Sequence, residues 1–96
     1  MPRIIRRAEA ADVPILLDLY RELHPSDPPV PPETAEQAWT KITAQHGRTI
    51  LVATQDDTLT GAVDCLVVPN LTRSARPFML IENVIVAAAA RRGGTG

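Results

Sequence analysis

The chain has 96 residues, enough for one small domain with a core of modest size. Apolar residues make up 45% of it and charged residues 22%, a composition typical of a globular protein rather than a disordered one. The net charge of -1 excludes the overall basic field that nucleic-acid-binding proteins usually carry.

A strand and a helix are predicted at the N-terminus. Residues 3–8 form a short run in which Ile4 and Ile5 stand among arginines, consistent with a first strand. Asp12 can cap a helix that we expect to run to about Leu23. The apolar residues that repeat at the spacing of one buried helical face are Val13, Leu16, Leu17 and Tyr20.

A proline-rich connector and a second helix follow. Residues 24–32 hold five of the nine prolines, which favours an extended backbone within one domain. A helix is predicted from about Glu33 to Gln45, and Gly47 is suited to end it. The residues at helical spacing are Ala35, Ala38, Trp39 and Ile42.

Three strands are expected in the second half of the chain. Residues 49–54 and 62–68 are rich in β-branched and aliphatic residues, and the turn signals between them, residues 55–57 and Gly61, predict a hairpin. After a polar loop, residues 78–86 are nearly all apolar, which predicts a central strand covered on both faces. The predicted order is β-α-α-β-β-β, an α+β fold with a mixed sheet. The four alanines at 87–90 could equally begin a helix.

The last six residues form a basic, glycine-rich motif, Arg91-Arg92-Gly93-Gly94-Thr95-Gly96. Three glycines let backbone amides approach an anion beside two guanidinium groups, so the motif predicts a phosphate-binding loop. It is neither a Walker P-loop nor a complete dinucleotide fingerprint. The alternative is that Arg91 and Arg92 are solvated charges.

The spacing Arg-x-x-Gly-x-Gly after the strand at 78–86, itself preceded by two helices and a hairpin, resembles the GNAT superfamily of acyl-CoA-dependent N-acetyltransferases. Residues 5–8, 11–14 and 19–25 also look like the family's first strand and helix. The resemblance spans all 96 residues and implies the N-terminal half of an acyl-CoA N-acyltransferase fold, a largely antiparallel sheet with two helices. Because complete members continue further, we expect residues 1–96 to be a single, truncated GNAT-like domain.

The resemblance implies transfer of an acetyl group from acetyl-CoA to a primary amine. Glu82 stands where some members carry the general base, although it could instead be a carboxylate at the sheet surface or paired to an arginine. The backbone of the strand's end would pair with the pantetheine arm, and a nearby main-chain amide would polarise the thioester carbonyl. The residues implied in coenzyme binding are Val84, Ile85, Val86, Arg91, Arg92, Gly93, Gly94, Thr95 and Gly96.

Other side chains carry weaker signals. His24 and His46 have no ligand-spaced partners, so no metal is expected. Cys65 has apolar neighbours and is expected to be a buried small hydrophobe. The N-terminus is not a signal peptide, and the apolar stretch at 78–90 is too short to span a bilayer. We therefore expect a cytoplasmic protein with no membrane or nucleic-acid partner.

Two functions remain open. The first is an N-acetyltransferase that acts on a small-molecule or peptide amine, present in a truncated form to which no general acid can be assigned and whose activity alone the sequence leaves open. The second is a non-catalytic GNAT-like binding or dimerisation module. Loss of the later strands would expose one edge of the strand at 78–86, which predicts a homodimer or pairing with a complementing C-terminal half.

Overall fold

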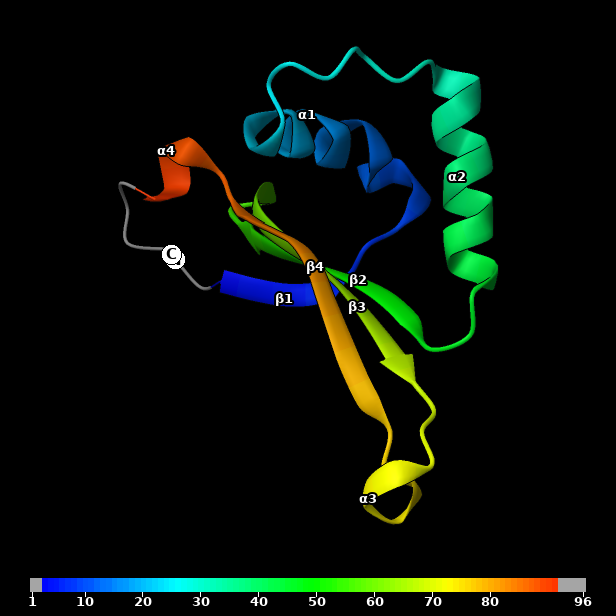
Figure 1. Ribbon diagram of the computed structural model, residues 1–96. Coiled ribbons are helices and arrows are strands. Elements are labelled where there is room, and N and C mark those ends of the chain that lie inside the picture. Colours follow the sequence, from blue (N-terminus) through cyan, green and yellow to red (C-terminus); the bar gives the residue numbers. More distant parts are fainter. Residues whose placement is uncertain (1–2, 92–96) are drawn as a thin grey trace.

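The computed structural model describes residues 3–91, which form one antiparallel sheet with its two long helices on the same face (Figure 1). The sheet order β1-β2-β3-β4 follows the chain. Its strands are β1 (Arg3–Arg7), β2 (Arg48–Gln55), β3 (Thr58–Val68) and β4 (Phe78–Val86). The α+β class and the predicted order of two helices and four strands are confirmed. No helix among the described residues is long and apolar enough to cross a membrane.

The first long helix, α1 (Val13–Leu23), contributes the helical side of the core. Leu16 and Leu19 are buried against the sheet, whereas the predicted face residues Val13 and Leu17 are only partly buried. The buried sheet residues of this core are Ile50, Val52, Leu59, Ala62 and Ile85. The core is therefore aliphatic and lies between α1 and the sheet.

Asp12 precedes α1 as predicted, but its side chain does not cap the helix. Asp12 ends a short 3₁₀ turn, η1 (Ala10–Asp12), and its Oδ2 accepts a hydrogen bond from the backbone amide of Glu9 at 2.7 Å. Its two oxygens also accept from the Arg6 guanidinium at 2.7 and 2.9 Å. Both oxygens are therefore used in a bidentate, charge-assisted pair that directs the carboxylate back toward β1.

The second long helix, α2 (Pro32–Ala44), starts and ends one residue before the predicted positions. Only Ala35 is buried on it, while Trp39 and Ile42 pack partly against the core. Figure 1 shows α2 beside α1 rather than flat on the sheet. Two pockets are lined by residues of both helices.

The predicted hairpin between β2 and β3 is confirmed, but β3 begins at Thr58 rather than at residue 62. The turn contains only Asp56 and Asp57, both with positive φ (53° and 63°), as a two-residue hairpin turn requires. Because Gln55 already pairs with Thr58, Gly61 lies inside the strand and not in the turn.

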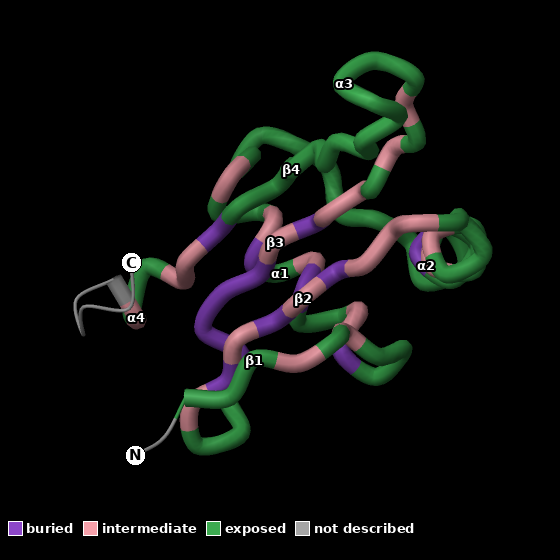
Figure 2. The backbone as a smooth tube through the Cα atoms, turned by 90° about the horizontal axis from the view of Figure 1, so that it is seen from below, coloured by how far each residue is buried: buried purple, intermediate pink, exposed green. Residues whose placement is uncertain are grey.

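The predicted central position of β4, covered on both faces, is wrong. β4 is an edge strand, and five of its apolar residues are 45 to 58% exposed, namely Phe78, Met79, Leu80, Ile81 and Val84. Figure 2 shows this strand exposed along most of its length. The physical reason is that residues 3–91 supply no strand beyond β4 and no long helix on the opposite face.

The face of the sheet opposite the helices is apolar and bare in the described part of the chain. Side chains alternate between the two faces along each strand, and paired residues share a face. The strand registers accordingly place together Ile5, Leu51, Val63, Cys65 and Ile81. Cys65 is therefore only partly buried, and the expectation of a buried thiol is wrong.

Candidate functional site

A β-bulge interrupts β4 immediately after Glu82. Ala62 pairs with Ile85 and Asp64 pairs with Glu82, so Val63 of β3 faces two residues of β4. One of these two, Asn83, has a left-handed φ of 51°, which asparagine tolerates better than most residues. A bulge leaves backbone groups outside the hydrogen-bond ladder and re-aims the neighbouring side chains.

Of the residues predicted to pair with pantetheine, Val84 completes the bulge, and Ile85 and Val86 follow it. Ile85 points into the core and is only 6% exposed, whereas Val84 is exposed and Val86 is partly buried. The backbone of Ile85 and Val86 pairs with β3 on one side, and no described strand pairs with the other side. An extended ligand that carries amide groups could hydrogen-bond along this open edge, as peptides do when they extend a sheet.

Glu82 lies on the helix-covered face of the sheet, in a pocket of about 250 Å³. The other lining residues are Arg48, Asp64, Leu66, Leu80 and Asn83. Glu82 is exposed, and no described residue forms an ion pair or hydrogen bond with its carboxylate. Its predicted alternative, a pair with an arginine, does not occur within residues 3–91.

Arg48 pairs instead with Asp64, which the sequence analysis did not single out. The Arg48 Nε donates to Asp64 Oδ1 at 3.0 Å and its Nη2 donates to Asp64 Oδ2. Asp64 is only 5% exposed, and its hydrogen bonds raise the pKa of Arg48 above its ordinary value. A carboxylate within the otherwise apolar run of β3 was the available signal for this pair.

Tyr20 of α1 lies near the Arg48–Asp64 pair, whose charges act on its hydroxyl, although it does not line the pocket beside Glu82. Its hydroxyl is buried and has no hydrogen-bond partner among the described residues. Burial raises the pKa of Tyr20, and the nearby negative charge of Asp64 raises it further, while Arg48 opposes the shift. The tyrosine therefore stays neutral and contributes an unused hydroxyl beside the Arg48–Asp64 pair.

Comparison with known proteins gives matches among solved structures, while no family model and no curated protein matches. An acetyltransferase of Agrobacterium tumefaciens shares 43% identity and superposes with a TM-score of 0.89, over 95% of this chain and 63% of that one. The chain has the fold of the N-terminal part of GNAT acetyltransferases. It thus spans less than two thirds of the length of its Agrobacterium relative.

Two more distant structures share the GNAT fold at lower identity. A GNAT family acetyltransferase of Staphylococcus aureus has 18% identity and a TM-score of 0.80, over 99% of this chain and 70% of that one. An acetyltransferase of Clostridium acetobutylicum, solved with acetyl-CoA, has 15% identity and a TM-score of 0.69, over 98% of this chain and 66% of that one. At these identities the likeness shows the fold alone.

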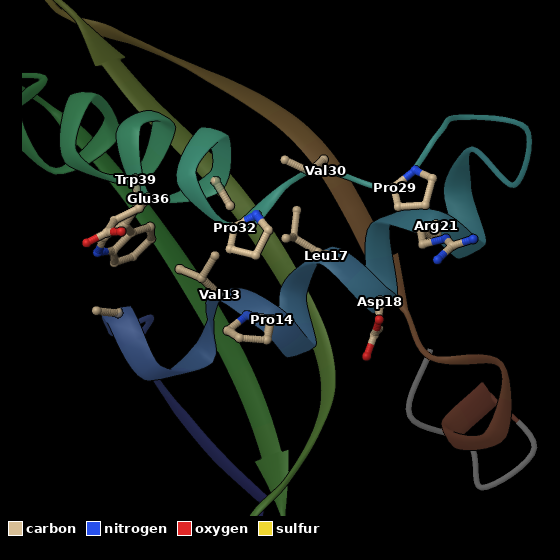
Figure 3. A pocket seen from close by; sticks show the side chains of 12 residues that line it. Val13, Pro14, Leu17, Asp18, Arg21, Pro29, Val30, Pro32, Glu36 and Trp39 are labelled. Atoms are coloured by element: carbon tan, nitrogen blue, oxygen red, sulfur yellow. The ribbon is translucent and has the colours of Figure 1, made fainter.

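A larger pocket of about 470 Å³ lies between the two long helices of this GNAT fold (Figure 3). Val13 and Leu17 of α1 point toward Val30 of the connector, and Trp39 and Glu36 border the pocket from α2. It shares no lining residue with the pocket beside Glu82. Its lining is mainly apolar, and its charged residues, Asp18, Arg21 and Glu36, belong to the helices rather than to the β4 bulge. The predicted base and the predicted pantetheine edge are both on β4, so we consider the chemistry beside Glu82.

The predicted phosphate loop falls almost entirely outside the described residues. Arg92, Gly93, Gly94, Thr95, Gly96 and the side chain of Arg91 are not described, and their role in coenzyme binding stays a prediction. The preceding alanines begin a short helix, α4 (Ala88–Arg91), as one alternative held. The Ala88 amide donates to the Glu22 carboxylate at 2.8 Å. Within residues 3–91, no three His, Cys, Asp or Glu side chains gather as a metal site would require.

Proposed function

We propose that this chain belongs to an acetyl-CoA-dependent N-acetyltransferase that acetylates a primary amine, with the reaction centre at the β4 bulge. The observation that carries the proposal is the position of the bulge. It places the predicted base, Glu82, directly before an interrupted ladder and the open edge of Val84–Val86 directly after it. The GNAT fold of the chain supports the same reaction class.

The residues present fit the coenzyme, because an arm that carries amides can pair with the unpaired edge of β4. When bound, acetyl-CoA supplies the acetyl thioester. A main-chain amide freed at the bulge donates a hydrogen bond to the thioester carbonyl and stabilises the oxyanion that forms on attack. Arg91 and residues 92–96 are proposed to hold the pyrophosphate.

Glu82 is proposed to accept a proton from the acceptor amine, which then attacks the carbonyl carbon. A carbon–nitrogen bond forms, the carbon–sulfur bond breaks, the nitrogen loses its second proton to water, and coenzyme A leaves as a thiolate. No described residue is placed to protonate that thiolate. The acceptor is proposed to be a small-molecule or peptide amine.

A thermal-shift titration with acetyl-CoA tests coenzyme binding. A ligand at a hundredfold excess over its Kd stabilises the native state by about 2.7 kcal/mol, which raises Tm by roughly 10 to 20 °C for a chain of this size. Glu82→Gln should leave this shift intact and lower thiol release with an amine acceptor by about a hundredfold. The matched control is Glu33→Gln, an exposed position in the first turn of α2. An unchanged Tm at millimolar acetyl-CoA would refute coenzyme binding by this chain.

A second candidate function is favoured by the bare apolar face of the sheet. In this alternative the chain is a non-catalytic binding or dimerisation module that pairs with a second copy or with a complementing C-terminal half. The exposed edge of β4 and the apolar residues beside it are typical of a surface that is covered in an assembly. Sedimentation velocity at micromolar concentration separates the two forms, since a monomer that binds acetyl-CoA would count against the module.

A further inference from the structure

The pocket beside Glu82 combines three charged side chains from three neighbouring strands. Arg48 comes from β2, Asp64 from β3 and Glu82 from β4, and the registers place all three on the helix-covered face. Tyr20 faces the same group from α1 and is neutral. One cation and two carboxylates give the pocket a net charge of -1, obtained as +1 - 1 - 1 from its lining residues.

The charge of Arg48 is already paired, and three of its five N–H groups are in use. All three of its guanidinium nitrogens already donate, Nε and Nη2 to Asp64 and Nη1 to Gln45 Oε1 at 3.0 Å. A bidentate contact with a carboxylate neutralises the guanidinium and fixes its plane. An acceptor that enters the pocket therefore meets the unpaired charge of Glu82 and no unpaired positive charge.

Asp64 is what keeps Arg48 occupied. An ionised carboxylate that is 5% exposed would be costly without a partner, so the two groups hold one another in place. The hydroxyl of Tyr20 is buried nearby and burial raises its pKa, so it is neutral and adds no charge of either sign. The sign of the pocket thus depends on one residue that does not itself carry out the chemistry.

We propose that this pocket selects a compact cationic amine without an anionic group, and that Asp64 is a positioning residue which sets this preference by neutralising Arg48. The inference rests on the proposed function, because it names the acceptor class of the same reaction centre. Two substitutions change the pocket in opposite directions. Asp64→Asn releases the charge of Arg48 and brings the pocket to neutrality, whereas Arg48→Gln leaves both carboxylates and makes it more negative.

Glucosamine and glucosamine 6-phosphate are suitable probes, because they share the amine and the ring and differ by one phosphate. The ¹⁵N-labelled 96-residue chain is titrated with each, and Kd is read from the amide shifts of Asp64 and Glu82. We expect the phosphorylated probe to bind at least tenfold more weakly, because its negative phosphate is repelled by the net negative charge of the pocket. Repulsion between unit charges a few ångströms apart changes affinity by about that factor. Asp64→Asn should reduce this ratio about tenfold, and Arg48→Gln should raise it.

Asp57→Asn is the control, because it removes the same charge from an exposed turn position whose positive φ asparagine readily adopts. It should leave the ratio of the two Kd values unchanged. A merely structural role for the pair would move both pocket variants in the same direction. Equal binding of the two probes, a ratio that Asp64→Asn does not change, or no shift at either amide would overturn the inference. The titration needs no acetyl-CoA, so its failure is distinguishable from failure of acetyl transfer.

Discussion

Gly47, which directly precedes Arg48, is the position at which one added methyl group should disturb both the fold and the site. Its φ is +83°, and a Cβ built there would lie 2.6 Å from the carbonyl oxygen of Val67. The left-handed conformation costs about 1 kcal/mol for a residue with a Cβ. Relieving the clash displaces the end of β3 and weakens the 2.9 Å bond from the Val67 amide to the Gly47 carbonyl, a further loss of about 1 kcal/mol. We expect Gly47→Ala to lower the free energy of unfolding by about 2 to 3 kcal/mol.

Urea denaturation followed by circular dichroism measures this loss, with an unchanged m-value as the sign that only stability has changed. Gly61→Ala is the matched control. Its Cβ would lie 3.0 Å from the Ile85 carbonyl, and its φ is not positive, so we expect a cost below about 1 kcal/mol. Gly47→Ala should also displace Arg48 and weaken binding beside Glu82. A cost for Gly47→Ala no larger than that for Gly61→Ala would refute the reasoning from backbone conformation.

Three further outcomes are expected. Leu19→Ala should cost about 2 to 4 kcal/mol in urea denaturation, because Leu19 is buried between α1 and the sheet; a loss under 1 kcal/mol would mean that the core is not packed as described. The hydrogen bonds from Arg6 lower the pKa of the Asp12 carboxyl below its ordinary value of 3.8, so its stabilisation is full at neutral pH and is lost as the pH falls through the folded-state pKa. Asp12→Asn should therefore have a lower free energy of unfolding than the parent at pH 7, and the difference should vanish in acid. Urea denaturation at several pH values measures it, and an equal difference at neutral and acidic pH would contradict this. Ile81→Lys should shift any dimer toward monomer in sedimentation velocity without lowering stability, because Ile81 is exposed at the bare face of the sheet.

Local signals in the sequence predicted most elements of the fold. The apolar repeat of Leu16 and its neighbours located α1, and the proline-rich connector separated it from α2. The predicted start of β3 is wrong because Gly61, a turn signal in the sequence, lies inside the strand. Two consecutive aspartates in the left-handed conformation close the hairpin without it. A turn that extends to Gly61 and a two-residue turn at Asp56 and Asp57 differ in whether Gln55 pairs with Thr58. That pairing cannot be predicted from each strand considered alone.

The candidate site could not be predicted from local sequence, because it depends on contacts between strands. Glu82 was singled out from its place in a family motif, but its neighbours Arg48 and Asp64 are 16 residues apart and meet through a diagonal contact across β2 and β3. Neither residue belongs to a local motif, so only the register brings them together.

The error in β4 has the same origin. An apolar strand with few polar positions is expected to be covered on both faces, and this composition is present in residues 78–86. An apolar composition indicates that a strand is stabilised by burial. Whether its side chains are in fact buried depends on which strands and helices lie beside it. Within residues 3–91 the helices cover one face only, so the apolar side chains of β4 stay exposed. The same exposure leaves the backbone edge beside the bulge open, which is the feature that the proposed coenzyme pairing requires.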